Sequence, residues 1–119
     1  MKNRPFRERL GFALAGLARA LRTERSLRTQ AVIAVLALAA LAVLRPPLVW
    51  WALIGTLAAL ILAAELFNTA LEELADHLHP QLHPRIRRVK DFAAAAVLIL
   101  SLGALWVGVL MLLAVLHRG

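Results

Sequence analysis

The stretch Leu48–Asp76, LVWWALIGTLAALILAAELFNTALEELAD, decides the fold because it joins a long apolar run to a cluster of acids. No residue from Leu48 to Ala64 is charged, whereas the next twelve residues include Glu65, Glu72, Glu73 and Asp76. A helix needs about 20 apolar residues to cross a hydrocarbon core of about 30 Å. We therefore expect this run to cross a membrane by continuing into the acidic part, which places acids at the end of a span.

Two more apolar runs flank this stretch. The first, Ala31 to Leu44, contains only Ala, Val, Ile and Leu, and the second, Phe92 to Leu116, has Ser101 as its one polar interruption. The second run shows no polar face for water, which disfavours a soluble helical bundle. With 119 residues, 61% of them hydrophobic, the chain is expected to be one all-α integral membrane domain. Its predicted parts are an amphipathic surface helix (5–25), three spans (27–46, 48–75 and 89–117) and a loop (76–88).

The basic residues are distributed unevenly around these spans. The net charge is +7, from 14 Lys and Arg against 7 Asp and Glu. Twelve of the 14 precede the first span or follow the second, and only Arg45 and Arg118 lie on the other side. The positive-inside rule then places the N-terminus and the 76–88 loop in the cytoplasm and the C-terminus outside. Because these charges flank membrane spans without base-stacking aromatics, nucleic-acid binding is disfavoured. The late start of the first run, followed by Arg-Pro-Pro, disfavours a signal peptide.

Four polar residues of the acidic stretch share one side of a helix. Glu65, Asn68, Glu72 and Asp76 recur every three or four residues, whereas Glu73 falls to the side and is expected to take no part in chemistry. Ionisable groups at membrane depth are costly and usually face a protein interior or a pathway. We therefore interpret these four residues as a functional column, with a solvated helix end as the alternative for Asp76.

Two more polar positions have competing interpretations. Lys90 and Asp91 precede the third span, where they could bind phosphate or form a basic flank with an N-cap aspartate. Glu24 stands in a strongly basic segment, where its alternative is an ion pair with Arg28 one turn later.

Carboxylates without any cysteine favour a hard cation such as Mg²⁺, which is usually held by one or two carboxylates and substrate phosphates. A nearby lysine completes a set suited to phosphoryl transfer, although the glycine-rich loop of soluble nucleotide-binding proteins is absent. The spacing of His77, His79 and His83 is only a weak zinc signal. A rival interpretation is a non-enzymatic ion pathway or membrane scaffold, but a pathway requires polar residues through the whole membrane depth.

Three segments together resemble a known family. AELFNTALEELAD (64–76), VKDFAAAAVL (89–98) and FALAGLARALRTERS (12–26) are similar to the signature of the bacterial integral-membrane diacylglycerol kinases, a family that includes undecaprenol kinases. The resemblance implies a homotrimer in the cytoplasmic (inner) membrane, with active sites shared between subunits at the cytoplasmic boundary. It implies transfer of the γ-phosphate of MgATP to a lipid hydroxyl, giving phosphatidic acid from diacylglycerol or undecaprenyl phosphate from undecaprenol.

The resemblance also implies a role for each matching residue. Glu65 would be the general base, and Asn68 would orient it or the phosphates. Glu24 and Glu72 would hold Mg²⁺. The residues expected to bind ATP are Glu72, Asp76, His83, Lys90, Asp91 and Phe12, and those expected near the lipid are Glu65, Gly16, Arg22 and Ser26. Arg4 or Arg7 is expected to supply a further nucleotide contact.

Overall fold

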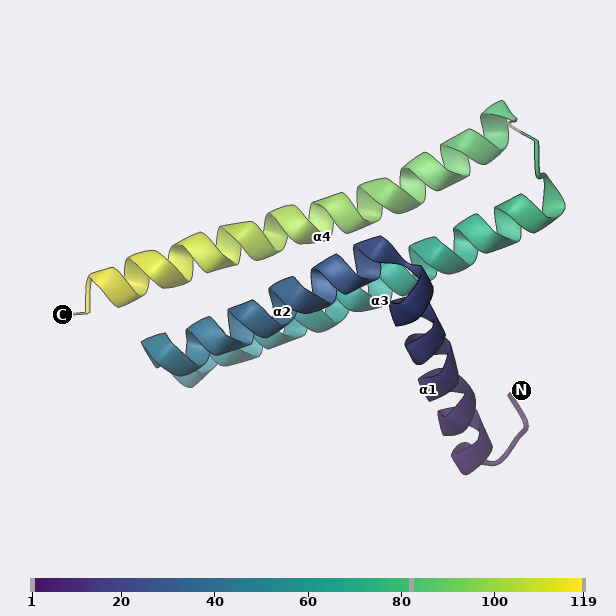
Figure 1. Cartoon of the computed structure of the whole chain (residues 1–119). Coiled ribbons are helices and arrows are strands. Elements are labelled where there is room, and N and C mark those ends of the chain that lie inside the picture. Colours follow the sequence, from purple (N-terminus) through teal and green to yellow (C-terminus); the bar gives the residue numbers. More distant parts are fainter. Residues whose placement is uncertain (1, 82, 119) are drawn as a thin grey trace.

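A computed structural model describes residues 2–81 and 83–118, which form four helices (Figure 1). They are α1 (Phe6–Thr23), α2 (Arg25–Leu44), α3 (Leu48–Leu78) and α4 (Pro84–Leu116). α3 packs between α2 and α4, and α1 projects away from this three-helix bundle. The all-helical prediction is confirmed, and α2, α3 and α4 are each long and apolar enough to cross a membrane.

The turn between α2 and α3 closes one end of the bundle, which we call the closed end (Arg45–Pro47 and Arg118). Arg45 has a positive φ of 49°, in the left-handed region that often ends a helix. Pro46 and Pro47 follow, and proline disfavours a helical conformation in the residue before it. The Arg118 guanidinium donates hydrogen bonds to the carbonyl oxygens of Leu44 and Arg45, the latter at 2.9 Å. Arg118 thus satisfies carbonyls that the end of α2 leaves unpaired.

The connection between α3 and α4 is shorter than the sequence predicts. α3 continues to Leu78 and α4 begins at Pro84, although we expected a loop over 76–88 and a third span from 89. Proline is well suited to the first turn of a helix, where its missing N–H costs nothing. His83 is the N-cap, and its Nδ1 accepts a hydrogen bond from the backbone N–H of Arg85 at 3.1 Å. Pro84 therefore starts a helix at a position where we expected a loop.

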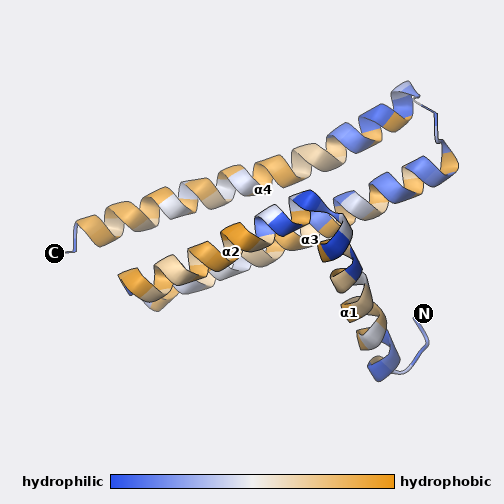
Figure 2. Cartoon of the chain, in the orientation of Figure 1, coloured by the Kyte–Doolittle hydropathy of each residue, from blue (hydrophilic) through white to orange (hydrophobic). Residues whose placement is uncertain are grey.

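The three long helices differ in length in a way that matters for the site. At about 1.5 Å per residue, α2 is about 30 Å long, which matches a hydrocarbon core, whereas α3 is about 46 Å and α4 about 50 Å. The excess lies at the end away from the closed end, and it is hydrophilic (Figure 2). We call this region, Glu65–Asp91 together with the joint between α1 and α2, the polar end.

A small core near the closed end joins all three long helices. Leu41 of α2, Ile54 of α3 and Met111 of α4 are buried against one another, and Trp50 and Trp51 pack around them. Most other large apolar side chains of the long helices are exposed in the single chain. Exposed apolar side chains along a span are expected where lipid tails or another protein surface replace water.

Leu41→Ala should lower the stability of the bundle by about 2–4 kcal/mol, because Leu41 is 0% exposed and its truncation leaves a cavity between three helices. The measurement is unfolding of the detergent-solubilised protein followed by loss of helical circular dichroism. Val43→Ala is the matched control, since Val43 on the same helix is 80% exposed and its truncation should change little. Equal effects of the two substitutions would contradict this packing.

Candidate functional site

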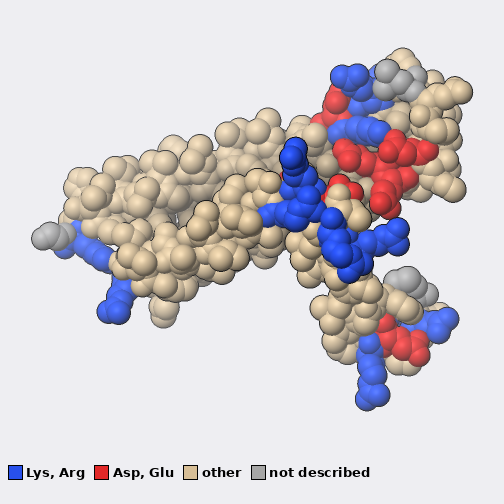
Figure 3. Space-filling view, viewed as in Figure 1, with Lys and Arg blue, Asp and Glu red and all other residues tan. Residues whose placement is uncertain are grey.

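The seven acids fall into two groups according to whether a cation accompanies them. Three form ion pairs: Glu8 with Arg4, Asp91 with Arg87, and Asp76 with Lys90. The other four, Glu24, Glu65, Glu72 and Glu73, form no ion pair with any residue in the described part of the chain. The acids of α3 gather at the polar end beside lysine and arginine side chains of α4 (Figure 3). The unpaired acids are therefore not explained by a general lack of nearby cations.

The predicted column on α3 passes from the interior of the protein to its surface. Glu65 is only 6% exposed, and it is the one buried charged residue among those that the structure describes. Asn68 lies one turn later, and its Oδ1 is buried without a hydrogen-bond partner among the described residues. Glu72 is half-buried and Asp76 is exposed. From Glu65 to Asp76 the helix rises about 16 Å, so the column extends along about three turns of α3 toward the hydrophilic end of the bundle (Figure 2).

Asp76 connects α3 to α4. Its Oδ1 accepts a hydrogen bond from Lys90 Nζ at 2.6 Å, which brings together two residues that we expected at the nucleotide. Asp91 instead pairs with Arg87 one turn earlier on α4, at 3.9 Å. Because α4 already begins at Pro84, the alternative interpretation of Asp91 as an N-cap is wrong. The column side of α3 thus faces the basic first turns of α4.

Glu24 occupies the joint between α1 and α2. Its backbone is extended, and its side chain makes no capping hydrogen bond to either helix. The alternative of an ion pair with Arg28 is also wrong, because Arg28 Nη1 donates to the carbonyl oxygens of Leu21 and Arg22 at 3.0 and 2.8 Å. The carboxylate that the resemblance assigns to metal binding is therefore not used by the local structure.

A cavity of about 470 Å³ lies between α1 and α3. Gly16, expected near the lipid, contributes to its wall, together with Arg19 and Thr23 of α1 and with Thr69 and Glu73 of α3. Sequence reasoning excluded Glu73 because it falls beside the acidic column. A second face of α3 points toward α1. Its helical spacing could have revealed the position of Glu73, since this face consists of Leu66, Thr69, Ala70 and Glu73.

Other expected site residues lie outside this cavity. Phe12, Arg22 and Ser26 are exposed and do not contribute to the cavity wall. His83 caps α4, and its ring lies 5.7 Å from that of His79, centroid to centroid. Within the described residues no three His, Asp or Glu side chains converge as a set that could hold a metal ion. A zinc site at the loop histidines therefore has no support among these residues.

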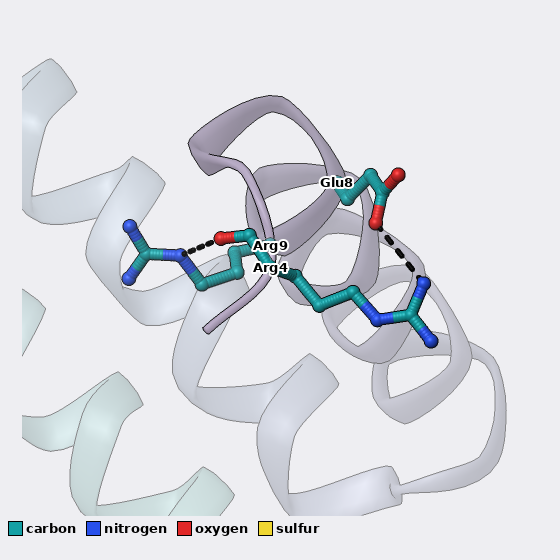
Figure 4. A network of polar contacts seen from close by, with 3 residues as sticks. All are labelled: Arg4, Glu8 and Arg9. Atoms are coloured by element: carbon teal, nitrogen blue, oxygen red, sulfur yellow. Dashed lines mark hydrogen bonds and ion pairs between the residues drawn. The ribbon is translucent and has the colours of Figure 1, made fainter. Parts of the chain in front are cut away.

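The N-terminal arginines differ in their contacts (Figure 4). Arg4 Nη1 pairs with Glu8 Oε2 at 3.3 Å, and Arg9 Nε donates to the carbonyl oxygen of Arg4 at 3.1 Å. Arg9 also lies over the ring of Phe6, 5.8 Å from its centroid. Arg7 has no hydrogen bond or ion pair with residues 2–81 or 83–118. Of the two arginines considered for the nucleotide, Arg4 is thus occupied and Arg7 is available.

Comparison with known proteins identifies similar sequences. The family model of prokaryotic diacylglycerol kinase matches residues 11–112. A diacylglycerol kinase of Synechocystis sp. is 32% identical over 103 residues, which cover 86% of this chain and 59% of that protein. An undecaprenol kinase of Bacillus subtilis is 30% identical over 98 residues, which cover 82% of this chain and 80% of that protein. The match thus spans less than two thirds of the Synechocystis protein but most of the Bacillus protein, and nearly all of this chain. The chain belongs to the prokaryotic diacylglycerol kinase family.

Proposed function

We propose that this protein is a lipid kinase that transfers the γ-phosphate of ATP to the hydroxyl of a membrane lipid, with diacylglycerol as the acceptor. The observation that carries the proposal is Glu65, a buried carboxylate without an ion-pair partner among the described residues, in a chain of this family. The alternative acceptor is undecaprenol, favoured by the similarity to the Bacillus subtilis enzyme.

The depth of Glu65 suits an acceptor that cannot leave the membrane. Leu48 begins α3 at the closed end, and Glu65 follows about 26 Å later, close to the far boundary of a hydrocarbon core of about 30 Å. The hydroxyl of a membrane alcohol lies near this boundary. Glu65 takes the hydroxyl proton, the lipid oxygen bonds to the γ-phosphorus, and the bond from that phosphorus to the bridging oxygen breaks to release ADP. Asn68, one turn away, orients Glu65 or the phosphates through its unpartnered Oδ1.

The cavity between α1 and α3 is a suitable place for the acceptor lipid. It lies on the face of α3 next to the column, and Gly16 contributes to its wall. Apolar contacts are available from Leu17 and Leu66. Polar contacts are available from four other wall residues: Arg19, Thr23, Thr69 and Glu73. This mixture suits a molecule with an apolar chain and a polar head.

The nucleotide is proposed to bind at the opposite face of the column, toward α4. Lys90 supplies the cation for the phosphates, and its bond to Asp76 holds it beside the column in the absence of ATP. The other proposed contacts to the nucleotide come from Glu72, Asp91, His83 and Phe12. Arg7 is the available N-terminal arginine.

The unpaired carboxylates Glu72 and Glu24 fit Mg²⁺, since both are hard oxygen donors that no cation neutralises within the described residues. Fewer than three such groups converge in the described part of one chain, which suits an ion that takes its other ligands from ATP and water. When bound, the ion neutralises charge on the transferring phosphates.

The proposed location is the bacterial inner membrane, with the polar end in the cytoplasm. The support is the uneven distribution of basic residues, because only Arg45 and Arg118 lie at the closed end. We propose that α1 lies in the membrane interface. Its exposed Phe6, Leu10, Leu14 and Leu17 would enter the acyl boundary while its arginines face anionic headgroups.

A second and a third copy of the chain are proposed to complete the site as a homotrimer. Phe67, Leu71, Leu74 and Leu78 form an exposed apolar stripe on α3 at helical spacing. Twenty residues of α3 suffice to cross the bilayer, so most of this stripe lies beyond the hydrocarbon, where lipid tails cannot cover it. Another protein surface is the remaining way to keep it from water.

Purified protein offered diacylglycerol or undecaprenol with MgATP in mixed micelles should phosphorylate diacylglycerol with the higher kcat/KM. The measurement is transfer of labelled phosphate to extracted lipid. Faster turnover of undecaprenol would select the alternative acceptor. Turnover of neither lipid would contradict the proposed function.

Glu65→Gln should reduce turnover by at least about 100-fold, because a general base contributes a factor of about 10² to 10⁴ and glutamine cannot accept the proton. The assay is the same lipid phosphorylation at saturating substrates, with circular dichroism as a check on folding. Glu8→Gln is the control, since Glu8 on α1 is paired with Arg4 and has no proposed role in the reaction. A folded Glu65→Gln protein with near-normal turnover would remove Glu65 from the mechanism.

Phe67→Gln should weaken self-association, because Phe67 is 72% exposed in the single chain and begins the stripe. Light scattering with size-exclusion chromatography in detergent should show a shift from trimer toward smaller species. Phe6→Gln on α1 is the matched control, as Phe6 is 69% exposed but lies outside the stripe. An unchanged trimer mass for Phe67→Gln would exclude this residue from the contact between subunits.

A further inference from the structure

The joint between α1 and α2 consists of a single residue. Glu24 has φ −107° and ψ 110°, whereas its neighbours Thr23 and Arg25 are helical. Its N–H donates to the carbonyl oxygen of Ala20 at 2.8 Å, and its own carbonyl oxygen accepts from the N–H of Arg28 at 3.2 Å. Rotation about the backbone of this one residue would change the direction of α1. Contacts of α1 with α2 across the joint, together with its contacts with α3, therefore fix that direction.

Arg28 makes such a contact from the first turn of α2 back to the last turn of α1. Its Nη1 donates to the carbonyl oxygens of Leu21 and Arg22, at 3.0 and 2.8 Å. Carbonyls in the last turn of a helix lack partners within the helix, and a cation there also interacts favourably with the helix dipole. Hydrogen bonds from a charged donor are among the stronger ones in proteins. Arg28 is therefore a brace across the joint.

The brace has a direct consequence for Glu24. An arginine four residues after a glutamate commonly pairs with it, but here the guanidinium is used on the backbone of α1 instead. The Glu24 side chain caps neither helix and forms no ion pair within the described residues. The same contact that fixes the joint thus leaves the carboxylate available.

Apolar packing also crosses the joint, but it constrains direction less. Leu27 of α2 is 1% exposed and Ala20 of α1 is buried. Burial of such groups keeps the two helices together, yet the hydrophobic effect has no directional preference. The two hydrogen bonds of Arg28 depend on angle as well as distance. Loss of Arg28 should therefore broaden the range of α1 directions without detaching α1.

We propose that Arg28 is a positioning residue that fixes the direction of α1 and holds the Glu24 carboxylate free for the metal ion. It acts through Glu24 and α1 and contacts neither ATP nor lipid in this role. The part that concerns the direction of α1 stands independently. The part that concerns the metal ion rests on the proposed function, in which Glu24 is a Mg²⁺ ligand.

The direction of α1 can be measured by electron–electron spin resonance, because the chain has no cysteine of its own. One spin label is placed at Leu14→Cys on α1 and one at Val35→Cys on α2, both exposed positions. Labelled protein is diluted with unlabelled protein so that only distances within one chain are recorded. The parent and the control Arg25→Gln should give one narrow distance distribution, and Arg28→Gln a clearly broader one. Arg25 is a suitable control because it carries the same charge in the same turn, without a hydrogen bond or ion pair to a described residue.

Lipid phosphorylation supplies the second measurement. In Arg28→Gln the Mg²⁺ concentration for half-maximal activity should rise about ten-fold, the loss expected from one charge-assisted hydrogen bond, while the KM for lipid stays within about two-fold. Arg28→Lys keeps a charged donor that can reach the same carbonyls, so it should recover both the narrow distribution and most of the Mg²⁺ response. It also provides a milder variant if Arg28→Gln inserts poorly.

The outcomes separate the two parts. An unchanged distance distribution in Arg28→Gln overturns the proposal, whatever happens to activity. A broader distribution with an unchanged Mg²⁺ response overturns the link to the metal ion. If the parent protein phosphorylates neither lipid, the proposed function fails, while the distance measurement still decides whether Arg28 fixes α1.

Discussion

The thickness of the hydrocarbon core is the constraint on which the rest of this structure depends. α2 matches a core of about 30 Å, but α3 and α4 are longer by about 15–20 Å, and all of the excess is at one end. Charged groups on these helices are tolerated at low cost only in or near that excess. The Glu65–Asp76 column begins about 26 Å along α3, close to the full length of α2, and protein packing buries its first member.

α3 organises the polar end because it presents two different faces there. One face carries the column and reaches α4 through the bond between Asp76 and Lys90. The other carries Thr69 and Glu73 and forms a cavity with α1. A reaction between a soluble nucleotide and a lipid requires the two substrates to approach the same atoms from different environments. A single helix with one face toward the basic start of α4 and the other toward α1 provides such an arrangement.

The sequence was sufficient for the broad architecture but not for the contacts at the helix ends. Three candidate spans follow from long apolar runs, and the acidic signature indicated the family, which the family model confirms. The start of α4 at Pro84 was missed because a proline in the sequence is equally compatible with the end of a helix and with the first turn of a new one. The spacing of Glu24 and Arg28 predicts an ion pair only if both lie in one continuous helix, whereas the extended backbone at Glu24 interrupts it. Glu73 was excluded because one face of α3 was considered, and the position of α1 beside the other face cannot be read from α3 alone.

The pairing of the acids is the strongest argument that the polar end is built for a ligand. The chain has twice as many Lys and Arg as Asp and Glu, and Glu8, Asp76 and Asp91 have each found a cation. Because basic residues are in excess, a carboxylate that stays unpaired in the protein interior or at a helix joint does not reflect a shortage of cations. Glu24, Glu65, Glu72 and Glu73 remain unpaired within the described residues, and all of them except the exposed Glu73 are at least partly buried. Isolated buried charges are costly, and they are stabilised when a metal ion or a proton from a substrate reaches them. Two such carboxylates suit a divalent ion on ATP phosphates, and the buried third suits a hydroxyl proton, so a single pattern of unpaired acids accounts for both halves of the proposed reaction.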